Sequence, residues 1–181
     1  MFKSSILLLV PLLLFVACNP RQSNSLPPLP QEMAQHSSRI KLTDAERPKN
    51  IILMIGDGMG LTQITAGMYS NGNKLNLERF PAVGLHKSYS SDNLVTDSAA
   101  GATAFSAGQK TYNGAMGVDP DTTALYTILE EAEDQGLATG LVATSTIVHA
   151  TPASFIAHEA QRSYYEAIAA DFLDPEVDLF I

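Results

Sequence analysis

The segment from Asn50 to Gly60 constrains the fold of this chain more than any other. It reads Asn-Ile-Ile-Leu-Met-Ile-Gly-Asp-Gly-Met-Gly, so an apolar run over 51–55 is followed directly by a carboxylate between glycines. A short continuous apolar run is typical of a strand buried on both faces, as strands of parallel sheets are. Parallel strands need helical crossovers between them, so the segment predicts an α/β fold.

The rest of the chain alternates between apolar strand-like runs and helical patterns. We expect strands at 82–89, 137–144 and 177–181, and helices at 61–70, 98–107, 123–135, 152–158 and 163–172. The expected architecture is α/β, with a central, mostly parallel sheet flanked by helices on both faces. The sequence ends within an apolar strand and has no internal repeat, so we expect the sheet to be incomplete at the C-terminus.

The first 17 residues have the layout of a secretory signal. Lys3 is followed by an apolar run over 6–16, and small Ala17 precedes Cys18, the only cysteine of the chain. The run is too short for a membrane-spanning helix, which needs about 20 residues. A lone cysteine at this place resembles the bacterial lipoprotein signal, in which the cysteine becomes the lipidated first residue; an ordinary signal with an incidental Cys18 is the alternative. Residues 1–17 are thus the expected signal peptide.

Residues 18–38 contain four prolines among serine, asparagine and glutamine, with no apolar period. They predict a flexible tether behind a lipidated Cys18, with folded structure over 39–181. The expected location is outside the cytoplasm, as a membrane-anchored lipoprotein of the periplasm or cell surface. A hydrophobic content of 45% excludes wholesale disorder, and a net charge of −8 argues against nucleic acid as a dedicated partner.

Asp57 is expected at the carboxyl end of the first strand, where open α/β sheets bind ligands. The surrounding glycines do not form the dinucleotide pattern G-x-G-x-x-G, because Leu61 stands where the last glycine is needed, and no G-K-[ST] follows. Two interpretations remain for Asp57. It is either a metal ligand, since hard cations bind carboxylate oxygen, or the cap of a plain strand-to-helix turn.

A second set of residues begins with Asp97 and Ser98. Asp97 is a favourable N-cap, which places Ser98 in the first helical turn, where backbone N–H groups favour an anion such as phosphate. A serine hydroxyl there becomes a nucleophile if a metal ion activates it; a capped structural helix is the alternative. Ser106 lies in Ala-Phe-Ser-Ala-Gly and lacks the first glycine of the G-x-S-x-G elbow, which disfavours a serine esterase.

A third set comprises His149, Thr151 and Arg162. Arg162 is the only Lys or Arg between 111 and 181, a region with twelve Asp and Glu residues. Its planar guanidinium suits an oxyanion or one carboxylate partner, and a surface salt bridge is the alternative. Thr151 precedes a proline, so we expect it at a helix entrance with its hydroxyl available to a cation. His149 either serves a metal site or packs.

Taken together, the blocks at 50–60, 95–104 and 149–153, followed by Arg162, resemble the amino-terminal part of bacterial alkaline phosphatases. The similarity runs from about Lys49 to Ile181. The resemblance implies that residues 39–181 are the N-terminal part of such a catalytic domain. It also implies a cofactor set of two zinc ions and one magnesium ion, and a homodimer is a further possibility.

Residue roles follow from the resemblance alone. Asp57 would bridge a zinc and the magnesium, and Thr151 would give its hydroxyl to magnesium. His149 would lie beside the magnesium site, at a position where some members have Asp and others His. Ser98 would be a metal ligand and the nucleophile that attacks a phosphate monoester, giving a phosphoserine that water then hydrolyses.

Arg162 would hold two phosphoryl oxygens, with Asp97 orienting it. The family supplies its remaining metal ligands from sequence beyond Ile181, so we expect residues 1–181 alone to be inactive and poorly folded. Two alternatives stay open. One is another hydrolase of the same superfamily, such as a phosphodiesterase or sulfatase, or a phosphoglycerate mutase. The other is a non-catalytic lipoprotein that binds phosphate or metal, or the product of a broken gene.

Overall fold

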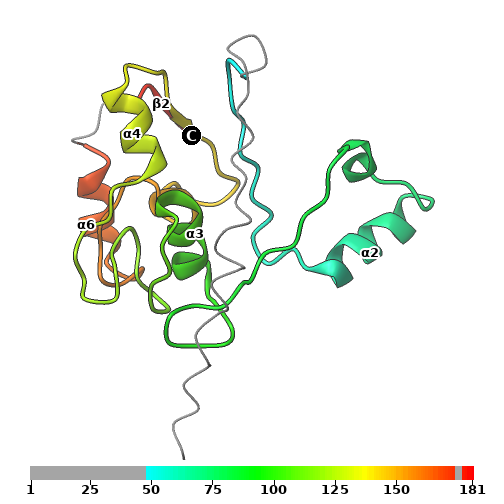
Figure 1. Ribbon diagram of the computed structural model, residues 1–181, viewed down its shortest axis with the longest axis horizontal. Coiled ribbons are helices and arrows are strands. Elements are labelled where there is room, and N and C mark those ends of the chain that lie inside the picture. The colour runs from blue at the N-terminus through cyan, green and yellow to red at the C-terminus, as the bar shows by residue number, and fades with distance from the viewer. Residues whose placement is uncertain (1–47, 174–176) are drawn as a thin grey trace, which may run out of the picture. The chain divides into compact units, whose positions relative to one another are not determined.

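The computed structural model describes residues 48–173 and 177–181 (Figure 1). The expected signal peptide, lipidated Cys18 and tether lie outside these residues. The chain divides into two compact units, Met1–Ile52 and Leu53–Ile181, and nearly all described residues belong to the second. Within the described part, no helix is long and apolar enough to cross a membrane.

The described residues form short helices and a small sheet. The helices are α2 (Leu61–Ser70), α3 (Ser98–Ala107), α4 (Ile128–Asp134), α5 (Ala150–Ala153), α6 (Tyr165–Asp171) and the 3-10 helix η2 (Asn76–Arg79). The strands β1 (Gly140–Leu141) and β2 (Leu179–Phe180) run parallel, with Gly140 opposite Leu179. Parallel strands separated by helices confirm the α/β class.

Helices α2 and α3 match the predicted ranges residue for residue, and in α3 both ends carry strong local signals. The Asp97 carboxylate accepts a hydrogen bond from the Ala100 N–H at 2.9 Å and so caps α3. Gly108 ends α3 with φ +68°, a left-handed conformation that glycine adopts without steric cost. Both signals depend only on residues within one turn of the helix end, so they could be recognised from the sequence alone.

Helix α4 begins at Ile128, so the predicted start at 123 is wrong. The Thr127 hydroxyl accepts from the Glu130 N–H, and the Glu130 carboxylate accepts from the Thr127 N–H at 2.7 Å. This capping box fixes the first turn. Residues before it belong to a bridge between Val118 and Ala124. The helical spacing of apolar residues extends to positions before Ile128, so it does not mark where the helix begins.

The predicted strands are the main correction. Residues 51–55 and 82–89 are not strands in the described structure, and β1 and β2 have two residues each. The expected burial of the first run is also wrong, because Met54 is 82% exposed and Leu53 58% exposed. A strand requires a neighbour that accepts its backbone hydrogen bonds, and no described segment pairs with these runs.

The two C-terminal helices are shorter than predicted. The expected helix over 152–158 is α5, which starts two residues earlier and ends at Ala153, and the helix over 163–172 is α6. Helix α5 packs against α3, and small buried side chains line this contact, among them Ala99 and Ala153, both fully buried. The Ser106 hydroxyl of α3 also donates to the buried Ser154 carbonyl at 2.7 Å. Close packing of α3 and α5 brings Ser98 and Thr151 to one end of the pair.

The buried core lies around this helix pair. Its members are Ala99, Met116, Leu129, Ala150, Ala153, Phe155, Ile156, Ala157, Ile168 and Phe172. Helix α4 contributes Leu129 and α6 contributes Ile168, so both helices pack on the core that supports α3 and α5. The elements that carry Ser98 and Thr151 are therefore held by the best-packed part of the described structure.

Candidate active site

Asp57 lies in a tight turn after the first apolar run and joins two distant segments. The Met59 N–H donates to the Gly56 carbonyl at 3.1 Å, and Gly58 has φ +65°. The Ser98 Oγ donates to Asp57 Oδ1 at 2.9 Å, and the Thr151 Oγ1 donates to Asp57 Oδ2 at 2.7 Å. One carboxylate thus gathers hydroxyl groups 41 and 94 residues away in sequence.

These contacts also set the charge of Asp57. The hydrogen bond from Thr151 lowers the pKa of the Asp57 carboxyl, and the bond from Ser98 and the nearby Arg162 charge lower it further. Partial burial opposes the shift but does not reverse it. Asp57 is therefore a carboxylate at neutral pH, suited to bind a cation and poorly suited to accept a proton.

Ser98 occupies the first turn of α3, within hydrogen-bond distance of Asp57. A hollow of about 370 Å³ opens beside it. The side chains that line the hollow include Asp57, Asp97, Ser98, Phe105, Thr151 and Arg162. The predicted carboxylate, hydroxyl and guanidinium groups therefore face one space, next to the positive end of a helix.

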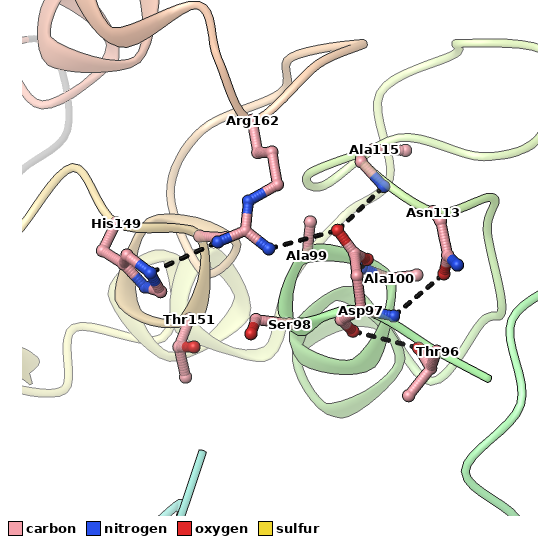
Figure 2. Close-up of polar contacts among 12 residues, drawn as sticks. Thr96, Asp97, Ser98, Ala99, Ala100, Asn113, Ala115, His149, Thr151 and Arg162 are labelled. Atoms are coloured by element: carbon pink, nitrogen blue, oxygen red, sulfur yellow. Dashed lines mark hydrogen bonds and ion pairs between the residues drawn. The ribbon is translucent and has the colours of Figure 1, made fainter. Parts of the chain in front are cut away.

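Arg162 lies between Asp97 and His149 (Figure 2). Its Nη1 donates to Asp97 Oδ2 at 3.2 Å, and its Nη2 lies 3.2 Å from His149 Nε2. A guanidinium can only donate, so His149 Nε2 accepts and the ring proton is assigned to Nδ1. Two of the five guanidinium N–H groups make these contacts, and among the described residues the other three have no partner, so they are available to an oxyanion.

Asp97 fixes the position of Arg162 and also caps α3. One oxygen accepts from the Ala100 N–H at 2.9 Å, and the other accepts from the Gly114 N–H at 3.1 Å as well as from Arg162. The carboxylate is therefore held by backbone groups on two sides. A partly exposed ion pair of this kind contributes about 1 kcal/mol or less to stability, so its main consequence is the orientation of the guanidinium.

Asn113 was missed by the sequence analysis. Its Oδ1 accepts from the Asp97 N–H at 2.9 Å (Figure 2). Its Nδ2 donates to the Val95 carbonyl at 2.9 Å. The Asn-Gly pair at 113–114 is a recognised turn signal. The turn could have been predicted from it, but its contact with a segment 16 residues earlier could not.

Three further residues do not line the hollow. Ser106 is 2% exposed and donates to the Ser154 carbonyl, which agrees with the expectation that it is not an esterase nucleophile. His86 packs edge-on against Phe105, with ring centroids 5.8 Å apart. His158 lies between the Gly117 carbonyl and the Glu130 carboxylate, at 2.8 Å and 3.0 Å. These contacts give each of the three a structural role.

The oxygen atoms around Asp57 suit a hard cation. The carboxylate and the hydroxyls of Ser98 and Thr151 converge, and hard or borderline dications prefer oxygen ligands. Within residues 48–173 and 177–181, no group of three or more His, Cys, Asp or Glu side chains is placed to hold a metal ion. The described residues therefore fit part of a metal coordination shell.

The chain is similar to known phosphatases. The alkaline phosphatase family model matches residues 48–176. Alkaline phosphatase 3 of Bacillus subtilis is 44% identical over 158 residues, which cover 83% of this chain and 34% of that protein. The alkaline phosphatase of Escherichia coli K12 is 47% identical over 127 residues, covering 65% of this chain and 27% of that protein.

A solved structure agrees with these relatives. A mutant of the TAB5 alkaline phosphatase with Mg bound in its M3 site matches with a TM-score of 0.66 and 49% identity, over 68% of this chain and 36% of that one. The chain spans about a quarter to a third of the length of these curated relatives. Because the family match covers most of the chain and the fold agrees, the chain belongs to the alkaline phosphatase family.

Proposed function

We propose that the whole protein is a metal-dependent phosphate monoester hydrolase in which Ser98 is the nucleophile. The observation that carries this proposal is the place of the Ser98 hydroxyl. It lies at the N-terminus of α3, donates to Asp57 at 2.9 Å, and faces the same hollow as Arg162. Family membership and the set of residues around the hollow support a phosphoryl group as the species that binds there.

The residues around the hollow have separate roles in the proposed phosphoryl transfer. The Ser98 hydroxyl gives up its proton to solvent and its Oγ attacks phosphorus; the bond from phosphorus to the leaving alcohol breaks, the alcohol oxygen takes a proton from water, and a phosphoserine forms. A water molecule then attacks the phosphoserine, the bond from phosphorus to Oγ breaks, Oγ takes back a proton, and phosphate is released. Arg162 donates to the non-bridging oxygens, and backbone N–H groups at the start of α3 add positive potential. Asp97 and His149 hold the guanidinium from its two ends.

Asp57, Ser98 and Thr151 would hold the metal ions through oxygen, with His149 beside them. Two zinc ions and one magnesium ion, when bound, supply positive charge that lowers the pKa of the attacking group and neutralises the phosphate. The low pKa of Asp57 supports this role, because a carboxylate that stays ionised binds cations and does not compete for the serine proton.

We also propose that the protein is exported and anchored to a membrane by lipid on Cys18. The support is the apolar run over 6–16 and the small residue before the cysteine. A Cys18→Ala variant would then leave the membrane fraction and lose incorporation of labelled fatty acid. Equal membrane association of both proteins would contradict the proposal.

The proposed hydrolase activity is tested with protein expressed from its whole reading frame. The substrates are three chromogenic aryl compounds: a phosphate monoester, a phosphate diester and a sulfate ester. We expect the monoester to be hydrolysed fastest, and we expect a chelator to stop the reaction and zinc with magnesium to restore it. Ser98→Ala should abolish turnover. A preference for the diester or the sulfate would indicate another activity of the superfamily, and inert wild-type protein with both metals added would contradict catalysis altogether.

A further inference from the structure

The Asn113 carboxamide makes two hydrogen bonds to the backbone immediately before Ser98. Its oxygen accepts from the Asp97 N–H, and its nitrogen donates to the Val95 carbonyl, both at 2.9 Å. A side chain that binds the N–H of one residue and the carbonyl two residues earlier fixes the path of the segment between them. That segment leads directly into the first turn of α3, which carries Ser98.

The next residue connects the same turn to the arginine segment. The Gly114 N–H donates to Asp97 Oδ2 at 3.1 Å, and the Gly114 carbonyl accepts from the backbone N–H of Arg162 at 2.7 Å. Gly114 has φ +96°, and a Cβ there would lie 2.7 Å from the Gln161 side-chain oxygen. Turn 113–114 therefore lies between the nucleophile segment and the segment that binds phosphate.

The turn is itself held on both flanks. The Asn113 N–H donates to Asp92 Oδ1 at 3.0 Å, and this oxygen also accepts from the Ser90 hydroxyl at 2.7 Å. On the other side, the Tyr112 hydroxyl donates to the Ala160 carbonyl at 2.9 Å. A carboxamide presented from a fixed turn can impose a position on the backbone it binds.

We propose that Asn113 is a positioning residue that sets the place of Ser98 relative to the bound phosphoryl group. This inference rests on the proposed function of Ser98. Asn113 itself does not line the hollow, so it acts through Val95 and Asp97. Phosphoryl transfer depends on in-line alignment of the attacking oxygen, so a displaced helix start lowers the rate even when the substrate still binds.

Replacement of Asn113 by alanine removes both bonds and leaves the Asp97 N–H and the Val95 carbonyl without these partners. A displacement of about 1 Å at a reacting group can lower the rate about 100-fold. We therefore expect Asn113→Ala to lower kcat about 10- to 100-fold. Affinity for inorganic phosphate should change less, because the backbone carbonyl of Gly114 still holds Arg162 in this variant.

The experiment measures kcat, KM and inhibition by inorganic phosphate for protein from the whole reading frame. The variants are Asn113→Ala, Asn113→Asp and Asn93→Ala. Asn113→Asp keeps the shape and the acceptor for the Asp97 N–H but loses the donor to Val95, so we expect a lower kcat here too. Asn93 is the matched control, because within residues 48–173 and 177–181 its side chain makes only one local hydrogen bond, in which Oδ1 accepts from the Val95 N–H at 2.9 Å.

Circular dichroism and thermal midpoints measure folding alongside the kinetics. A fall in kcat for the Asn113 variants, with phosphate inhibition nearly unchanged and Asn93→Ala like wild type, would support the proposal. A kcat equal to that of Asn93→Ala, or a loss that follows only the folded fraction, would overturn it. If Asn113→Ala does not fold, Asn113→Asp decides the question. Wild-type protein without activity or without phosphate on Ser98 would instead contradict the proposed function.

Discussion

Two serines of helix α3 should respond in opposite ways to replacement by alanine. Ser98 is half-buried at the start of the helix and donates to Asp57 at 2.9 Å. Ser106 is 2% exposed near the end of the helix and donates to the Ser154 carbonyl at 2.7 Å. The pair shares one helix and one residue type, so each variant is the control for the other.

The magnitudes follow from burial and from chemistry. Ser106→Ala removes the donor from a buried carbonyl, which costs about 1–3 kcal/mol of unfolding free energy. Ser106 lies eight residues from Ser98, about 12 Å along the helix at 1.5 Å per residue, so the folded protein should keep its kcat. Ser98→Ala should change stability by about 0.5 kcal/mol or less. It should lower turnover by orders of magnitude, since loss of a nucleophilic serine costs about 10⁶ in a serine protease.

The assay combines urea unfolding, followed by circular dichroism, with initial rates of monoester hydrolysis on protein from the whole reading frame. Rates are divided by the folded fraction, so that instability is not mistaken for loss of catalysis. The reasoning would be refuted if Ser98→Ala retained turnover, or if Ser106→Ala lost turnover at unchanged stability. Equal unfolding midpoints for Ser106→Ala and wild type would refute the cost assigned to the buried carbonyl.

Two other predictions concern stability and ionisation. Gly117→Ala should cost about 2–5 kcal/mol of unfolding free energy, from a left-handed conformation and overpacking, because its φ is +59° and a Cβ would overlap the Ala157 carbonyl oxygen. Gly136→Ala, with φ +69° and open space around it, should cost only about 1–2 kcal/mol in the same urea titration, and equal costs would contradict the clash. The hydrogen bond to Asp134 raises the pKa of Tyr126 to about 12, so the bond's stabilisation should be present below about pH 10 and lost as pH rises towards about 12. The pKa of Tyr126 is measured by absorbance titration, with Tyr126→Phe as the reference that lacks this phenol. The pKa should be lower in Asp134→Asn than in wild type, and an unchanged titration curve would contradict the assignment of the shift to Asp134.

The sequence predicted features that depend on neighbouring residues. Asp97 and Gly108 mark the ends of α3 through capping geometry that operates within one turn. The predicted site residues also lie together, although contacts such as Thr151 with Asp57 span 94 residues. That juxtaposition was expected from the resemblance of three separate blocks to one family, because spacing along the chain does not encode distance in space.

The strands could not be predicted in the same way. An apolar run becomes a strand only when another strand accepts its hydrogen bonds, and pairing partners are not marked within the run. Residues 51–55 therefore have no assigned secondary structure in the described part of the chain. Asn113 was missed for a related reason, since its bonds reach 16 and 18 residues back along the chain.

The most direct test of the central claim is the site of phosphorylation during turnover. Protein from the whole reading frame is mixed with a phosphate monoester, quenched in acid while the reaction runs, digested, and examined by mass spectrometry. We predict one phosphate on Ser98, none on Ser106, and none in Ser98→Ala. Monoester hydrolysis with Ser98 unmodified, or with phosphate on a different residue, would contradict the account.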